Sequence, residues 1–292
     1  MAIDSTLKVG GLVKERPRFS LATLFRDRGW VWWVGAALLT LLAAATGQPP
    51  VAALVVLLSP PVVLLVYVEL HERAHRVYSE STPTRHAAGL AFAMLLGFSW
   101  RIYLGHHANH HRYNDAEGDF AATADRNGRP RNGTWYLAKN AVFPFLTQCI
   151  PYLSVCGMRS RNRNAVAWLD ESLRVSFRLL WLVVFGVQGL IVLLLYQVSA
   201  LAFVIYVNYL QHFGTETPRR WTSELFNGLY RGFGIHDAHH RQPTRPGESL
   251  QSEAKSPSFD GFTIFNPLTF ILFCSSSVLL HGWVGTQRGA SP

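Results

Sequence analysis

The sequence predicts an all-α integral membrane protein with four transmembrane helices in two hairpins, a cytoplasmic histidine-rich cap and interfacial helices. Apolar residues make up 49% of the 292 residues and charged residues only 15%, whereas an average soluble domain carries about 25% charged residues. Long charge-free runs alternate with short polar stretches, and lysines and arginines flank the runs. Because no linker-like composition divides the chain, we expect one domain over residues 1–292.

The first hairpin follows a basic N-terminal segment, residues 1–28, which we expect to stay in the cytoplasm. Residues 30–47 form a charge-free run that begins with tryptophans, which are typical of a membrane interface. After a turn at residues 48–50, residues 51–70 return across the bilayer. The Pro60-Pro61 pair should kink this second helix, which delivers His71 to the cytoplasmic side.

The second hairpin is predicted from the most apolar part of the chain. Residues 177–196 form the strongest span, and residues 200–210 return after a turn at residues 197–199. The returning helix is short, so it must continue through Gln211 and His212 to cross. Both termini then lie in the cytoplasm.

Three further apolar segments are predicted not to cross. Residues 87–100 are too short, and crossing there would separate His107 from His71 by the bilayer. Prolines interrupt residues 141–157, which we interpret as interfacial. Asn266-Pro267 and a serine run interrupt residues 262–280, which we place against the cap.

The net charge of +9 is explained by the positive-inside rule, since the basic residues flank apolar runs and form no patch for nucleic acid. The run of arginines at residues 159–163 serves this topology or docks an acidic protein partner. Cys149, Cys156 and Cys274 lack CxxC spacing and are predicted to be buried free thiols, with no iron–sulfur module.

Nine of the twelve histidines fall into four compact groups. A His-x-x-His-His motif occurs twice, ending at His111 and at His240, and on a helix its imidazoles at i, i+3 and i+4 can point at one metal ion. The i, i+4 pair that ends at His75 also suits one metal. The nine grouped histidines are His71, His75, His107, His110, His111, His212, His236, His239 and His240, and their grouping predicts a multi-histidine metal centre.

Other interpretations explain less of the pattern. His71-Glu-Arg-Ala-His75 matches the zincin pattern, with Glu72 as general base of a metalloprotease, but a zincin leaves both His-x-x-His-His motifs unexplained. Haem is held by single histidines rather than clusters. His86 and His281 lack partners at metal spacing and receive no role. Asp115 and Asp119 either orient imidazoles or are solvated.

These motifs carry a family resemblance. HERAH, HANHH and HDAHH resemble the three histidine boxes of the membrane fatty acid desaturase and hydroxylase superfamily. HHRYNDAEGD resembles the second box with its following Asn-Asp, and NYLQH resembles the Asn and His that precede the third box. The resemblance covers about residues 51–245. The region from NYLQHFG to HDAHHRQPTRP also resembles alkane monooxygenases and the fatty-acid decarboxylases that make terminal alkenes.

The resemblance implies two non-haem irons held by the nine histidines, with Asn208 near one iron through water and no catalytic residue beyond the metal centre. All-imidazole ligation suits iron and leaves positions open for O₂. His106 offers a His-x-x-x-His-His alternative to His107, and we prefer His107 because it repeats the spacing of the third box.

The implied reaction is oxidation of a lipid or fatty-acyl chain with O₂ as co-substrate. Desaturation is the preferred reaction type, and hydroxylation and decarboxylation to a terminal alkene are the alternatives. An apolar tunnel between helices would hold the chain. An external donor, such as a ferredoxin, rubredoxin or cytochrome with its reductase, would supply electrons. The expected location is the inner or plasma membrane, with the active site on the cytoplasmic side.

Overall fold

The computed structural model describes residues 29–79, 83–125, 127–146, 161–213, 218, 220–221, 223–250 and 258–286. Over these residues the chain is mostly helical, and the one regular sheet pairs two strands of two residues each, β1 (Arg220–Trp221) and β2 (Ser258–Phe259), in parallel. The helices are α2 (Gly29–Thr46), α3 (Pro49–Leu58), α4 (Pro60–Ser79), α5 (Pro83–Leu96), α6 (Trp100–Tyr113), α7 (Gly133–Leu146), α9 (Arg161–His212), α10 (Glu224–Leu229), α11 (His236–Arg241), α12 (Pro267–Ser275) and α13 (Ser277–Thr286), with 3-10 helices η1 (Gly247–Ser249) and η2 (Gly261–Phe265).

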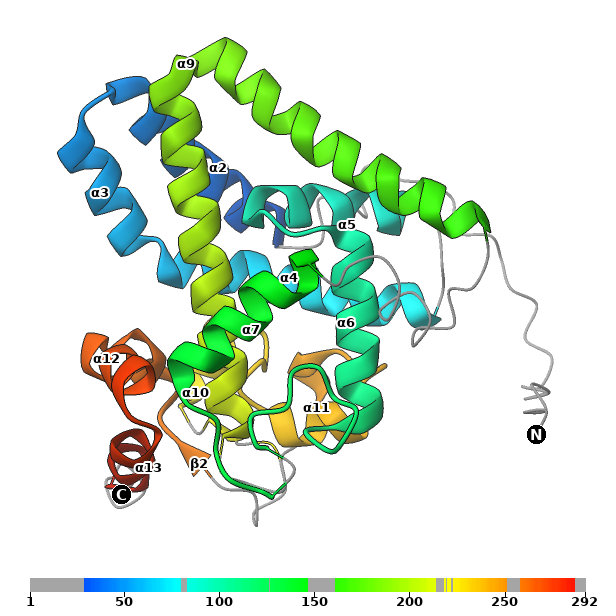
Figure 1. The fold of residues 1–292 in the computed structure, drawn as a ribbon, viewed down its shortest axis with the longest axis vertical. Helices are drawn as coiled ribbons and strands as arrows, with labels where there is room; N and C mark the ends of the chain where they lie inside the picture. Colours follow the sequence, from blue (N-terminus) through cyan, green and yellow to red (C-terminus); the bar gives the residue numbers. More distant parts are fainter. Residues whose placement is uncertain are drawn as a thin grey trace.

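The first hairpin consists of α2, α3 and α4, joined by a tight turn at Gly47 (Figure 1). Helices α3 and α4 meet at an angle of 53°, because Pro60 and Pro61 cannot donate to the preceding turn. The predicted kink is therefore confirmed. The basic segment 1–28 lies outside the described residues.

A sharp corner separates α5 from α6, which are bent by 97° at a break around Gly97. Gly97 has a positive φ of 80°, which favours glycine, and Ser99 caps α6 by accepting a hydrogen bond from the Ile102 N–H. Figure 1 shows α6 running from this corner toward the end of the molecule that contains α11. Because of this corner, the histidines of α6 lie close to those of α11.

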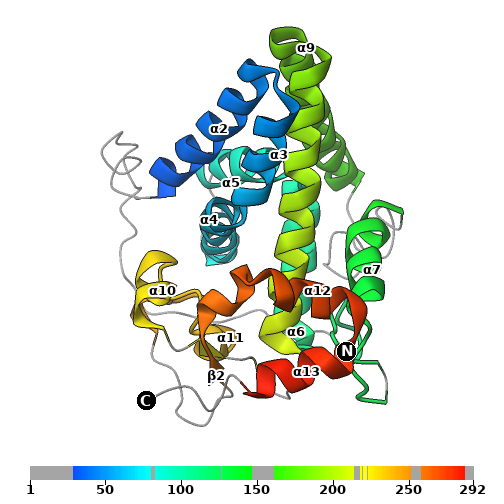
Figure 2. The same ribbon diagram turned by 90° about the vertical axis from the view of Figure 1, so that its left-hand side faces the viewer.

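The second hairpin turns at Gly186, and the predicted turn at residues 197–199 is wrong. Gly186 has φ 69° and ψ −171°, a conformation almost restricted to glycine, and there α9 folds back on itself (Figures 1 and 2). Gln197 remains inside the returning leg because its side chain accepts from Arg178 and donates to the Met94 carbonyl. The returning leg extends to His212, as predicted.

The remaining helices gather around α11, at the end of the molecule opposite the bend of α9 (Figure 2). The apolar segment 262–280 does not form one long helix there, since it breaks at Asn266, which caps α12, and again at Ser276. Its helix α12 packs against α7, at the histidine end where the segment was expected. Of the segment 141–157, residues 147–157 lie outside the described residues, as do Cys149 and Cys156.

Among the described residues, one helical segment, residues 169–212, is long and apolar enough to cross a membrane, and it comprises both legs of the bent α9. The bent pairs α3–α4 and α5–α6 each meet the same criterion when taken together. Large apolar side chains face outward on the first of these helices, with Val183 81% exposed and Val187 65% exposed. This pattern suits lipid as the surroundings. The four-span arrangement and the cytoplasmic side remain predictions.

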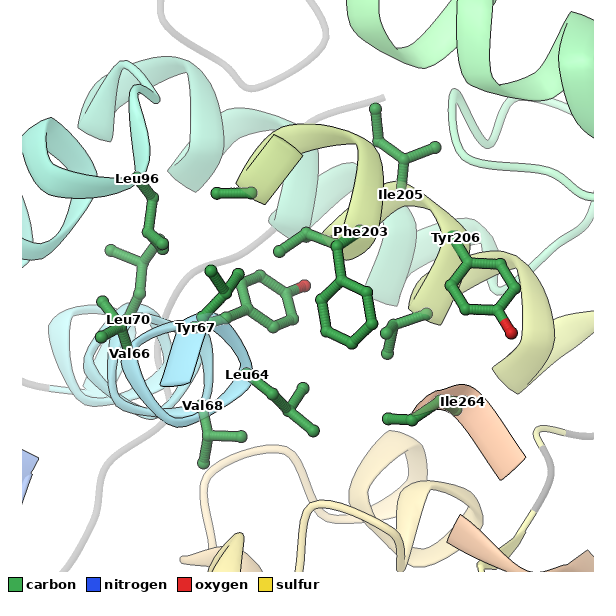
Figure 3. Packing of buried hydrophobic residues seen from close by; sticks show 14 of the residues in the cluster. Leu64, Val66, Tyr67, Val68, Leu70, Leu96, Phe203, Ile205, Tyr206 and Ile264 are labelled. Atoms are coloured by element: carbon green, nitrogen blue, oxygen red, sulfur yellow. The ribbon is translucent and has the colours of Figure 1, made fainter. Parts of the chain in front are cut away.

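One apolar core connects the hairpins to the histidine end. Figure 3 shows Leu64 of α4, Leu96 of α5 and Phe203 of α9 packed within it, with Ile264 of η2 contributed from the cap. The core therefore fixes α4, α6 and α9 relative to one another beside the histidines they carry.

Candidate metal centre

Four helices supply the nine predicted histidines. Helix α4 carries two, α6 three, α9 one at its last residue, and α11 three. The short helix α11 is tied to α4 on both sides: Arg231, before it, pairs with Glu69, and the Gly247 N–H, after it, lies 3.3 Å from Glu72 Oε1. All nine imidazoles thus lie in one region.

The structure divides the nine histidines into two groups, in each of which one ring nitrogen per residue lies within 4.8 Å of the others. The five-histidine group consists of His71, His75, His107, His111 and His239. The four-histidine group consists of His110, His212, His236 and His240.

Facing nitrogens in these groups lie at separations that are compatible with ligation of one metal ion. Five Nε2–Nε2 distances measure between 2.7 and 3.2 Å, among them His75–His107 at 2.7 Å and His110–His212 at 3.0 Å. Imidazole nitrogens about 2.1 Å from one ion, at right angles around it, lie about 3.0 Å apart. Both ring nitrogens of the buried His71 lack a hydrogen-bond partner among the described residues. The donor set therefore fits metal binding in both groups.

Helical spacing explains the partition, and the prediction that each His-x-x-His-His motif points at one metal ion is wrong. Residues at i and i+4 lie 40° apart around a helix, so His107 and His111 share one group. His110, at i+3, lies on the other side of His107 and joins the four-histidine group. In α11, His236 and His240 share a group while His239 joins the other. Both motifs bridge the two groups.

The imidazoles of α11 are held in the neutral form. Burial, followed by the neighbouring imidazoles, keeps the pKa of His236, His239 and His240 well below the ordinary histidine value. Neutral imidazole is the form that binds a metal ion.

Asp119 orients one histidine of the four-histidine group. Its Oδ2 lies 2.8 Å from His110 Nδ1, which leaves His110 Nε2 facing His212. Burial alone would raise the pKa of Asp119, but the interaction with His110 and the N–H groups of Asp115 and Ala121 outweigh it and lower that pKa to about 2. Asp115 differs, because both its oxygens bind Thr123. Burial raises its pKa to about 6.

The remaining candidates lie outside both groups. Glu72 is not a ligand in either group, and its Oε1 accepts from the Gly247 N–H. His106 belongs to neither group and interacts with Asn140, so the geometry favours His107 as the ligand. His86 Nδ1 accepts from Trp100 Nε1 at 3.2 Å, and the side chain of His281 lies outside the described residues.

A cavity of about 150 Å³ reaches both groups, at His107 and His110. Its walls are largely apolar or aromatic: Phe98, Ile102, Tyr103, Leu201, Val204 and Ile205. Asn208 also lines it and donates to Tyr136 Oη at 2.7 Å. No sequence signal pointed to Tyr136, nor to Glu171 and Arg174 at the cavity's far end, because none of them belongs to a motif.

The sequence was also compared with models of known protein families. The family model of the fatty acid desaturases matches residues 48–255, a range that contains all nine histidines, Asn208 and Asp119. None of the curated proteins compared with the chain matches it. With the family model covering most of its length, the chain belongs to the fatty acid desaturase family.

Proposed function

We propose that this protein is a membrane non-haem di-iron oxidase that uses O₂ and external electrons to oxidise an alkyl or acyl chain, with desaturation as the first choice of reaction. The observation that carries the proposal is the pair of adjacent all-histidine groups at one end of a largely apolar cavity. Family membership supports oxidation of fatty chains and puts desaturation ahead of hydroxylation or decarboxylation.

In this proposal each histidine group holds one iron. The five-histidine group holds the first and the four-histidine group the second, where the smaller ligand number leaves room for Asn208 to act through water. Iron bound there would supply activation of O₂ and removal of hydrogen from an unactivated carbon. We assign no other residue a chemical role.

The chain's own residues position the substrate and the ligands. The apolar walls exclude water and align an extended alkyl chain toward His107 and His110. Tyr103 stacks on His107 with ring centroids 5.4 Å apart and planes 8° from parallel, which fixes that imidazole beside the cavity. Asp119 fixes the ring of His110 through a contact of 2.8 Å with its Nδ1.

The proposal places the histidine end on the cytoplasmic side and requires a separate one-electron donor, such as a ferredoxin, rubredoxin or cytochrome with its reductase. It rests on the lysine and arginine bias of the sequence and on a metal set that contains only imidazoles. The side chains of the arginine run at 159–163 lie outside the described part of the structure, so their docking role stays a prediction.

The test is metal analysis of the purified protein together with turnover of fatty-acyl and alkyl substrates under O₂, with and without a reduced donor. We expect about two irons per chain and an oxidised product, identified by mass spectrometry, only when donor and O₂ are both present. One zinc per chain, with full hydrolytic activity in the absence of O₂, would refute the proposal.

A further inference from the structure

The far end of the cavity carries an ion pair near the start of the apolar segment 169–212. Both Arg174 Nε and a terminal nitrogen of Arg174 donate to Glu171 Oε2, and Arg174 donates from its other terminal nitrogen to the Gly97 carbonyl at 2.9 Å. Burying charged groups costs free energy, so an ion pair at the end of a largely apolar cavity needs an explanation.

A purely structural role, in which charged residues tie α9 to the α5–α6 corner, does not explain why Glu171 is present. The neighbouring Asp170 already accepts from Ser99 Oγ and from the Arg101 N–H, each at 2.8 Å, and so ties α9 to the start of α6. Glu171 lines the cavity instead, and its buried Oε1 has no hydrogen-bond partner among the described residues. A buried carboxylate oxygen without a partner costs free energy unless a ligand or water supplies a donor.

The charges around this end favour a neutral donor over an anion. Glu171 balances the charge of Arg174 within an ion pair, so the cavity end carries no net positive charge from this pair. A substrate carboxylate would face Glu171 as a like charge, whereas a hydroxyl would donate to Glu171 Oε1 and gain a charge-assisted hydrogen bond.

We propose that Glu171 and Arg174 form a head-group subsite that binds a neutral hydrogen-bond donor, a terminal hydroxyl, at the end of the substrate opposite the irons. This inference rests on the proposed function, since it names the substrate class of the same cavity. The substrate class is then a long-chain alcohol, oxidised at a carbon remote from its hydroxyl.

The length of α6 sets how remote that carbon is. Ser99 lies beside the subsite, and His107 and His110 follow it by 8 and 11 residues, which is roughly 12–16 Å along a helix. With C–C bonds of about 1.5 Å at tetrahedral angles, an extended alkyl chain covers this distance in roughly ten to thirteen carbons.

Equilibrium binding tests the subsite directly. The ligands are an n-alkanol, the n-alkanoate and the n-alkane of equal carbon number, measured on the iron-loaded protein in lipid nanodiscs at a pH where the acid is ionised. We expect the alkanol to bind about 10- to 100-fold more tightly than either of the others, as a hydrogen bond to a charged group should give. Tightest binding of the alkanoate or equal binding of the alkane would overturn the proposal.

Variants locate the effect at Glu171. Glu171→Gln keeps the shape but removes the negative charge beside Arg174, so it should remove the preference for the alkanol over the alkanoate. Asp170→Asn is the matched control, because Asp170 is a buried neighbour outside the cavity lining, and it should keep the wild-type ranking. An unchanged ranking in Glu171→Gln would overturn the subsite.

Product analysis separates this inference from the oxidase proposal. Oxidation roughly ten to thirteen carbons from the hydroxyl supports both. Oxidation of all three ligands with equal efficiency retains the oxidase and refutes the subsite. Preferential binding of the alkanol without any O₂-dependent product retains the subsite and refutes the oxidase.

Discussion

Replacing Asp119 by asparagine tests whether the two histidine groups hold separate irons. Asp119 accepts hydrogen bonds from His110 Nδ1 and the Asp115 N–H on one oxygen, and from the Ala121 N–H on the other. An amide has only one oxygen, so either orientation of the substituted side chain places an NH₂ group against an N–H donor. His110 thereby loses the charged acceptor that orients its ring.

The expected magnitude follows from the single ligand affected. Loss of a carboxylate that orients a metal-bound histidine typically lowers metal affinity about 10- to 100-fold, which corresponds to about 1.4–2.8 kcal/mol. The effect should fall on the four-histidine group, because no member of the five-histidine group contacts Asp119 in the described hydrogen bonds. We expect iron content to fall toward one per chain as a competing chelator is titrated.

Asp115→Asn provides the matched control. Asp115 is a partly buried acid in the same loop, but its side chain binds Thr123 rather than a histidine. Iron content measured by mass spectrometry across the chelator titration should therefore follow the wild type in Asp115→Asn and depart from it in Asp119→Asn. Identical titrations for the two variants would mean that Asp119 does not support a metal ligand.

Three further outcomes are expected. His212→Ala should abolish most activity and lower the iron content. Glu72→Gln should retain both irons, since the amide oxygen still accepts from the Gly247 N–H. A fully iron-loaded, active His212→Ala variant would contradict the ligand assignment. Gly186→Ala should destabilise the solubilised protein by about 1–3 kcal/mol through backbone strain alone. Gly35→Ala is the control, because an added Cβ meets no atom within 4 Å at either position. Equal melting temperatures for the two variants would contradict this expectation. Single cysteines at residues 48 and 120, in a background without native cysteines, should be labelled from opposite sides of the membrane, and labelling of both from the same side would exclude the four-span topology.

The identity of the histidines was predictable, whereas their division between two groups was not. Spacing at i, i+3 and i+4 is local, and it marked every member of both groups except His212, which only the resemblance identified as a ligand. Which group His110 joins depends on where α9 and α11 lie relative to α6, and that is a property of tertiary packing.

The turn of the second hairpin was misplaced for a similar reason. Gln197 is a polar residue between two apolar runs, as a turn residue would be, but Arg178 and the Met94 carbonyl satisfy its amide inside the bundle. Gly186 showed no contrast with its apolar neighbours, although its conformation sets the bend. The cavity was expected as a tunnel, but its polar end comes from Glu171 and Arg174, which precede the predicted span 177–196 and belong to no motif.

The order in which the four histidine-bearing helices are synthesised has a consequence for maturation of the centre. His239 follows His71 by about 170 residues. At a translation rate of about 5–20 residues per second, α11 is therefore synthesised roughly 8–34 s after α4. A chain that has not yet produced α11 already holds four members of the five-histidine group but only two of the four-histidine group. Iron can therefore bind to the five-histidine group before α11 is made, whereas the four-histidine group can hold its iron only after α11 has packed against α4.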